Sequence, residues 1–198
     1  MSDRILRTAM REFKSRGIKS VKMDDIATIL GISKRTLYEV CANKEELLLE
    51  CIRMSDAEEE EQMKAYAADA GHSVIDIVVE FYSRQMRNVS NVSPAFFQEM
   101  GKYGHVMEFL EQRKKRRCRD TMEFFMRGVR EGYFRSDVNF SLVHEIGVNS
   151  MDYAMRTRMY EEYGMKEVLH NIIFLFLRGM CTSEGISKLD RLLALGQA

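Results

Sequence analysis

The chain has 198 residues, enough for one large domain or two small ones, with 45% hydrophobic and 30% charged residues and a net charge of zero. Its N-terminal residues form no apolar signal region, and its longest apolar run is far shorter than the ~20 residues of a membrane span. These features argue against a secreted or membrane protein, and we expect the chain to act in the cytoplasm.

The first quarter of the chain is predicted to be a cluster of short helices. Apolar residues between Ile5 and Phe13 recur at helical spacing. Two short helices are expected at 24–30 and 34–40, and a fourth helix runs on towards the acidic segment Asp56–Glu61, which we expect to be a solvated face. Each boundary rests on a residue suited to end or cap a helix, namely Gly17, Gly31, Ser33 and Asn43.

The helices at 24–30 and 34–40, joined by a glycine turn, are typical of a helix-turn-helix unit. Residues 1–53 hold 11 basic and 8 acidic side chains, so this region is the candidate to bind an anionic partner. Once the apolar residues are buried, the polar side chains of the second helix must face outwards, which suits the major groove of DNA. A surface helix that only happens to be polar is the alternative. The predicted DNA contacts are Lys22, Lys34, Arg35, Thr36, Tyr38 and Lys44.

The stretches "MDDIATILGISKRTLYEV" and "NKEELLLECI" make residues 4–53 similar to the DNA-binding domain of the TetR/AcrR family of bacterial transcriptional regulators. The resemblance implies a helix-turn-helix domain at 1–53 and a helical effector-binding and dimerisation domain at 54–198. It also implies a homodimer that leaves a DNA operator when a small molecule binds. Three residues depart from the family pattern: Lys22, Arg35 and Cys41.

The remainder of the chain is predicted to be helical at about 73–90, 95–103, 106–131, 140–160 and 165–181, so the fold class is all-α. The basic run Arg113–Arg117 lies within one of these helices. Consecutive residues spread around a helix, so we expect this run to be a solvated surface, with contact to nucleic acid or an acidic effector as the alternative.

Methionine and phenylalanine are frequent after residue 60, which favours an adaptable apolar ligand cavity, with ordinary core packing as the alternative. The predicted lining residues are Gln85, Phe125, Asn149, Asp152, Tyr153 and Met155. By resemblance, the last two predicted helices pair with those of a second copy, although their pattern would equally suit an internal core. The predicted interface residues are Leu142, Ile146, Leu169, Ile172 and Ile173.

No metal, cofactor or enzymatic activity is expected. The four cysteines lack a CxxC pair, and His144-Glu145 starts a HExxH-like pattern whose second histidine is replaced by Val148. Reduced cysteines are expected, with redox sensing as the alternative. The sequence therefore predicts a homodimeric repressor that a small, mainly apolar ligand releases from a palindromic operator. The rival is an effector-independent DNA-binding structural or division-control protein on the same scaffold.

Overall fold

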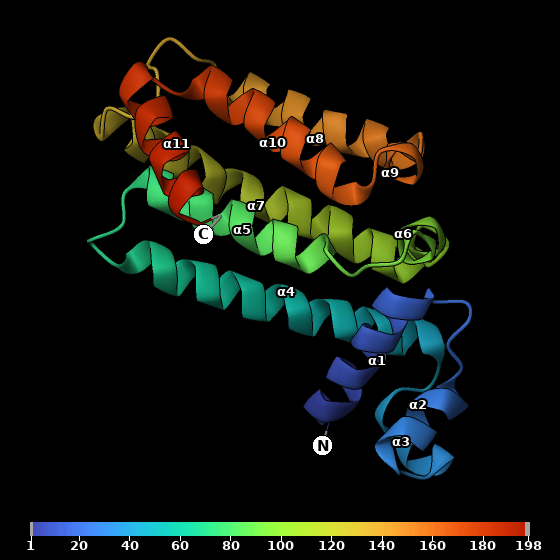
Figure 1. Cartoon of the computed structure of the whole chain (residues 1–198). Helices are drawn as coiled ribbons and strands as arrows, with labels where there is room; N and C mark the ends of the chain where they lie inside the picture. Colours follow the sequence, from blue (N-terminus) through green and yellow to red (C-terminus); the bar gives the residue numbers. More distant parts are fainter. Residues whose placement is uncertain (1, 197–198) are drawn as a thin grey trace. The chain divides into compact units, whose positions relative to one another are not determined.

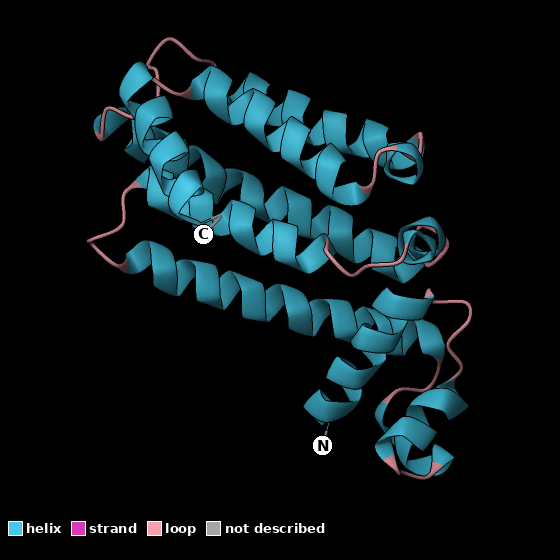
Figure 2. Cartoon of the chain, in the orientation of Figure 1, coloured by secondary structure: helices cyan, strands magenta, loops and turns pink. Residues whose placement is uncertain are grey.

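The computed structural model describes residues 2–196, apart from the side chains of residues 117–120, 195 and 196. The regular structure in this range is helical, as predicted, except for one isolated β-bridge between Phe134 and Cys181 (Figure 2). None of the described helices is long and apolar enough to cross a membrane. In chain order (Figure 1) the helices are α1 (Ser2–Arg16), α2 (Met23–Leu30), α3 (Lys34–Val40), α4 (Lys44–Ala68), α5 (Val74–Val89), α6 (Pro94–Met100), α7 (Gly104–Arg130), α8 (Phe140–Arg156), α9 (Met159–Glu162), α10 (Met165–Met180) and α11 (Ser183–Gly196).

The order of helices differs from the sequence prediction in two places. The segment 140–160 is broken at Arg158, whose φ of 57° lies in the left-handed region, so α8 and α9 are separate helices. We did not predict α11, which contacts α5. The helix ends at Gly17 and Gly31 are confirmed, with φ values of 82° and 67° that favour glycine.

The chain forms two compact units. Unit 1 consists of the residues up to Glu61 together with Asn91–Lys115, and unit 2 consists of Gln62–Ser90 and the residues from Arg116 on. Both α4 and α7 have residues in each unit. Unit 1 therefore includes α6 and the start of α7 in addition to the four N-terminal helices. The boundary at residue 53 between the DNA-binding domain and the effector-binding domain stays a prediction.

Unit 1 is built around an apolar core that begins with the buried face of α1. Its fully buried large side chains are Ile5, Phe13, Ile18, Ile26, Leu37, Leu47 and Leu48. Phe96 of α6 and Val106 of α7 join the same core. The short helices that would be unstable alone are thus held by tertiary packing.

Unit 1 also contains an ion pair whose carboxylate is buried, which corrects the sequence prediction for the acidic segment. Asp56 of α4 is only 6% exposed, and Arg113 Nη1 of α7 lies 3.1 Å from its Oδ1. The acidic segment is therefore not solvated at Asp56, whereas Arg113 of the basic run is half-buried. The side chain of Arg117 lies outside the described part of the run.

Unit 2 has a separate aromatic core. The ring of Phe125 stacks on Phe140 with centroids 4.9 Å apart, and Phe134 packs edge-on against Phe125. A Cβ at Gly128 would lie 2.0 Å from the Phe134 ring, so this close approach requires glycine. Phe125, which we predicted to line a ligand cavity, belongs to this core, and its ligand contact stays a prediction.

Candidate functional site

The helix-turn-helix unit is fixed by hydrogen bonds at the turn and by packing beneath it. After α2, the Gly31 N–H donates to the Thr28 carbonyl at 3.1 Å, and the Ile32 N–H donates to the Ala27 carbonyl at 3.0 Å. The side chain of Leu37 is completely buried below α3. These contacts fix the face that α3 presents to solvent.

The N-terminus of α3 is capped by Ser33. Its Oγ accepts a hydrogen bond from the Thr36 N–H at 3.1 Å and lies 2.9 Å from Thr36 Oγ1. Thr36 is half-buried, whereas Lys34, Arg35 and Tyr38 are exposed, with Tyr38 at 48%. Of the predicted DNA contacts on α3, Thr36 is thus the least available and Tyr38 presents an exposed phenol.

Both cations of α3 have acidic neighbours. The Lys34 ammonium bonds Asp24 of α2, and Arg35 Nε lies 3.0 Å from Oε1 of Glu39. The hydrogen bond to Asp24 and its negative charge raise the pKa of Lys34. All four side chains are largely exposed, and such surface pairs contribute little stability. DNA phosphates can therefore compete for both cations.

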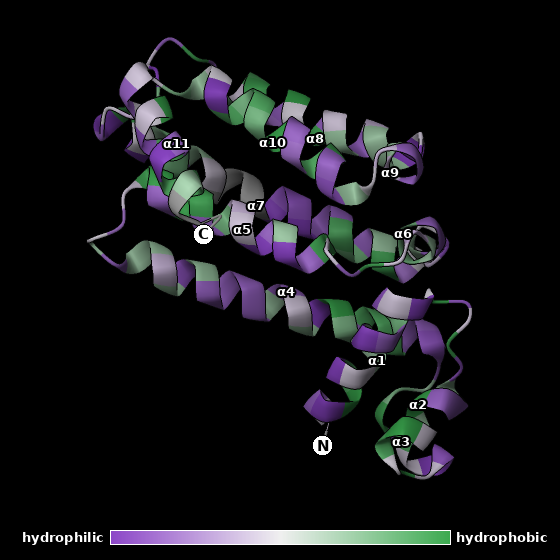
Figure 3. Ribbon diagram, viewed as in Figure 1, coloured by the Kyte–Doolittle hydropathy of each residue, from purple (hydrophilic) through white to green (hydrophobic). Residues whose placement is uncertain are grey.

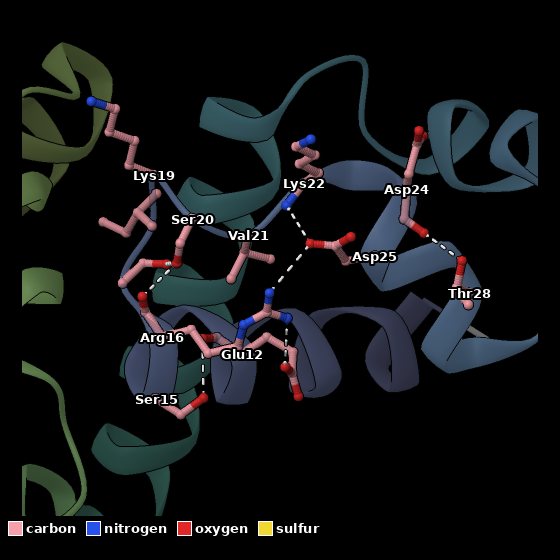
Figure 4. Close-up of polar contacts among 12 residues, drawn as sticks. Glu12, Ser15, Arg16, Lys19, Ser20, Val21, Lys22, Asp24, Asp25 and Thr28 are labelled. Atoms are coloured by element: carbon pink, nitrogen blue, oxygen red, sulfur yellow. Dashed lines mark hydrogen bonds and ion pairs between the residues drawn. The ribbon is translucent and has the colours of Figure 1, made fainter.

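Lys22 precedes α2 and carries an exposed ammonium group. Its backbone N–H donates to Asp25 Oδ2 at 3.0 Å, which is half of a capping box; the other half cannot form because lysine has no acceptor (Figure 4). The same carboxylate lies 3.6 Å from Arg16 Nη2 of α1. Sequence reasoning missed this link between α1 and α2. The Lys22 side chain has no hydrogen bond or ion pair among the described residues, so it can reach a phosphate.

Lys44 has a different environment from the one we predicted. Its Nζ donates hydrogen bonds to the carbonyls of Ile18 at 3.0 Å, Lys19 at 3.3 Å and Val21 at 3.0 Å. The ammonium thus holds the loop between α1 and α2. Any phosphate contact by this group competes with a structural role that the sequence did not indicate.

A hollow of about 680 Å³ lies among α8, α9 and α10 in unit 2. Of the predicted ligand residues, Asn149 and Tyr153 line it, whereas Gln85, Phe125, Asp152 and Met155 do not. Much of its wall comes from α9, α10 and the residues between them, none of which is among the predicted lining residues. The lining residues are Ile146, Asn149, Ser150, Tyr153, Ala154, Met159, Tyr163, Glu167, Val168, Asn171 and Ile172.

Exposed apolar side chains follow α8 and α10, which lie side by side (Figure 1) and carry hydrophobic segments along their length (Figure 3). Leu175 is 72% exposed and Leu142 is 52% exposed. The predicted interface residues Leu169, Ile172 and Ile173 are half-buried, and Ile146 is exposed. A face with this composition is typical of a protein–protein contact.

The cysteines that the structure describes are buried. Burial raises the pKa of Cys51 to about 12 and that of Cys181 to about 11, and it also raises the pKa of Cys41. A thiol with a raised pKa carries little thiolate near neutral pH and is unreactive. This favours the structural interpretation of these three residues; the side chain of Cys118 lies outside the described part.

Comparison with known proteins agrees with this architecture. The family model described as bacterial regulatory proteins, tetR family, matches residues 5–51. No curated protein matches the chain. The regulatory protein TetR from Rhodobacter sphaeroides has a TM-score of 0.70 at 17% identity, covering 90% of this chain and 97% of that one.

Two further solved structures share the fold. A transcriptional regulator from Saccharomonospora viridis in complex with choline has a TM-score of 0.70 at 18% identity, covering 91% of this chain and 97% of that one. A TetR-family transcriptional regulator from Agrobacterium tumefaciens has a TM-score of 0.69 at 15% identity, with coverages of 91% and 97%. Residues 5–51 thus match the tetR family of bacterial regulatory proteins, and the chain as a whole shares the fold of these three solved transcriptional regulators.

Proposed function

We propose that the protein is a cytoplasmic homodimeric repressor that binds a palindromic operator and is released by a small, mainly apolar molecule. The observation that carries the proposal is the exposed face of α3, where Lys34, Arg35 and Tyr38 surround a buried Leu37. Lys22 supports it as a phosphate contact at the start of α2. The dimer would place two α3 helices in major grooves about 34–36 Å apart, or a multiple of this distance.

Release by a ligand requires that operator and ligand prefer different states of the dimer. The helices α4 and α7 continue from one unit into the other, so a ligand bound in unit 2 can act on unit 1 through unbroken backbone. The S. viridis regulator was solved with choline, which supports a small-molecule effector as a class.

The DNA-binding proposal predicts a division of roles within the helix-turn-helix unit. Arg35→Ala should relax preference at one base pair by about 1–3 kcal/mol if the guanidinium contacts a base in bidentate fashion. Tyr38→Phe should weaken binding to every DNA sequence equally, because a phosphate contact carries no sequence information. Titration against genomic sites recovered by footprinting, and against scrambled duplexes, measures both effects.

Arg130→Ala is the matched control, since Arg130 is an exposed cation at the end of α7 in unit 2. It should bind both DNAs like the wild type. If Arg35→Ala lost the same affinity for the genomic sites and for the scrambled duplexes, Arg35 would have no base-reading role. If neither variant on α3 differed from Arg130→Ala, the proposed DNA surface would be wrong.

The proposed dimer interface predicts a second result. Leu175→Glu should convert the dimer to a monomer in sedimentation, because a twofold contact brings both new carboxylates into one apolar interface. Operator affinity should fall by orders of magnitude, since each monomer then holds a single half-site. Met126→Glu, at an exposed apolar residue of α7, should leave the dimer intact. A folded Leu175→Glu variant that remains dimeric would locate the interface elsewhere.

A further inference from the structure

An ion pair links the first turn of α2 to the first residue of α3. The Lys34 ammonium donates a hydrogen bond to Asp24 Oδ2, ten positions earlier in the chain. Among the described residues, Lys34 is the only hydrogen-bond or ion-pair partner of the Asp24 carboxylate. The backbone of Asp24 is fixed as well, because Thr28 Oγ1 donates to its carbonyl at 2.9 Å (Figure 4). Asp24 therefore holds the Lys34 ammonium against α2.

The folded state alone gives little reason for this pair. The capping contact of α2 is made by Asp25, whose Oδ2 accepts the hydrogen bond from the Lys22 N–H at 3.0 Å. A further negative charge in the first turn of α2 has only a modest effect on the helix. The side chains of Lys34 and Asp24 are 66% and 49% exposed, and a surface pair of this kind contributes little stability.

The pair belongs to the surface that is proposed to meet DNA. In a helix-turn-helix unit the N-terminal residues of the second helix approach base edges, while the first helix crosses the sugar–phosphate backbone. Because Asp24 contacts the Lys34 ammonium, the same geometry brings a carboxylate close to the duplex. A negative charge at this place weakens binding to every DNA sequence, since it repels phosphates.

The Lys34 ammonium can meet two kinds of acceptor on DNA, and Asp24 distinguishes between them. If Lys34 leaves the carboxylate for a phosphate, Asp24 stays unpaired beside the charged backbone, and this repulsion opposes the new contact. If Lys34 stays with Asp24, the remaining N–H groups of its ammonium can reach guanine O6 or N7. The second arrangement keeps the carboxylate neutralised. It requires a guanine at the matching position of the duplex.

We propose that Asp24 is a specificity-determining residue, which directs Lys34 to a guanine of the operator and opposes binding to other DNA. The inference rests on the proposed function, because it concerns the same DNA-binding face. Asp24 acts through Lys34 and does not itself need to touch the duplex. Its effect should therefore disappear when the ammonium is removed.

The test compares Asp24→Asn with the wild type in titrations against genomic sites recovered by footprinting and against scrambled duplexes. At about 0.15 M salt, Asp24→Asn should bind scrambled DNA on the order of fivefold more tightly, because the released Lys34 neutralises one further phosphate. The slope of log affinity against log salt should steepen by about 0.9 for each α3 that contacts scrambled DNA. Affinity for the genomic sites should not rise, so discrimination between the two DNAs should fall.

Control variants separate this mechanism from a general change of charge. Asp24→Glu keeps the carboxylate and should retain the discrimination of the wild type. Asp137→Asn releases Arg135 from another exposed ion pair, in unit 2, and should bind both DNAs like the wild type. In a Lys34→Met background, Asp24→Asn should leave the salt slope unchanged. Replacement of one G·C pair in each half-site should weaken the wild type but not Lys34→Met.

Two results would overturn the proposal. One is an Asp24→Asn variant that is folded, as thermal unfolding shows, and keeps the affinity and salt slope of the wild type on scrambled DNA. The other is an equal gain from Asp24→Asn with and without Lys34, since repulsion alone would then explain the effect. If Arg35→Ala and Tyr38→Phe behave as proposed, either result removes only the role of Asp24. If those variants also leave DNA binding unchanged, the proposed DNA surface fails with it.

Discussion

Arg113→Met is expected to lower the free energy of unfolding by about 1.5–3 kcal/mol, because it removes the charged hydrogen bond that the Arg113 guanidinium donates to the buried Asp56 carboxylate. Asp56 is 6% exposed, and its Oδ1 lies 3.1 Å from Arg113 Nη1. The methionine keeps most of the volume and the apolar stem of arginine, so the loss of stability reports on charge rather than on a cavity. Urea denaturation followed by circular dichroism measures the change.

Arg7→Met is the matched control for this prediction. Arg7 pairs with Glu58, only two residues beyond Asp56 on α4, but Arg7 is exposed and Glu58 is only half-buried. Exposed pairs contribute about 0–1 kcal/mol, so this variant should stay close to the wild type. The double variant Asp56→Leu with Arg113→Met should recover part of the stability, since no buried carboxylate then remains at this position. Equal stability of the two single variants would mean that the Asp56–Arg113 pair contributes no more than the Arg7–Glu58 pair at the surface.

The Asp56–Arg113 pair also illustrates what the sequence could not predict. Five consecutive basic residues cover every side of a helix, so their composition does not reveal which one faces α4. Which basic residue faces α4 depends on how α7 is rotated about its own axis when it packs in unit 1. The same limit applies to the acidic segment of α4, where Asp56 is buried and Glu58 is half-buried.

Local sequence signals were sufficient to predict the helix-turn-helix unit. Gly31 and Ser33 act within one turn of the helices that they end or begin, so their effects do not depend on distant residues. The break at Arg158 has no such signal, since no glycine or proline marks it. Ile186, Leu189 and Leu193 do recur at helical spacing in α11, so the signal for this helix was present in the sequence although we did not predict it.

Side-chain positions in unit 2 were less predictable than its helices. Phe125 and Tyr153 are both aromatic residues on predicted helices, yet Phe125 belongs to the core and Tyr153 lines the hollow. The difference arises from how α7 and α8 are rotated towards their neighbours. Composition favours a ligand cavity in this part of the chain but does not locate it.

Lys44→Met is expected to destabilise the protein by about 2 kcal/mol or more, because hydrogen bonds to charged donors each contribute roughly 1.5–3 kcal/mol and partial exposure reduces their sum. Three carbonyls of the loop between α1 and α2 would no longer be bound by the ammonium. This loop precedes Lys22 and α2, so its release should also disturb the helix-turn-helix unit. Thermal unfolding of the free protein measures the change in stability directly.

Lys22→Met separates this structural role from phosphate contact. Lys22 is exposed and its ammonium has no partner among the described residues, so its replacement should change stability by less than about 0.5 kcal/mol. The slope of log affinity against log salt should fall by about 0.9, as expected when the protein neutralises one phosphate fewer. Lys44→Met should weaken binding to operator and scrambled DNA alike at temperatures where it is folded, with the slope unchanged. An equally stable Lys44→Met variant with a reduced slope would show that Lys44 leaves the loop and binds phosphate.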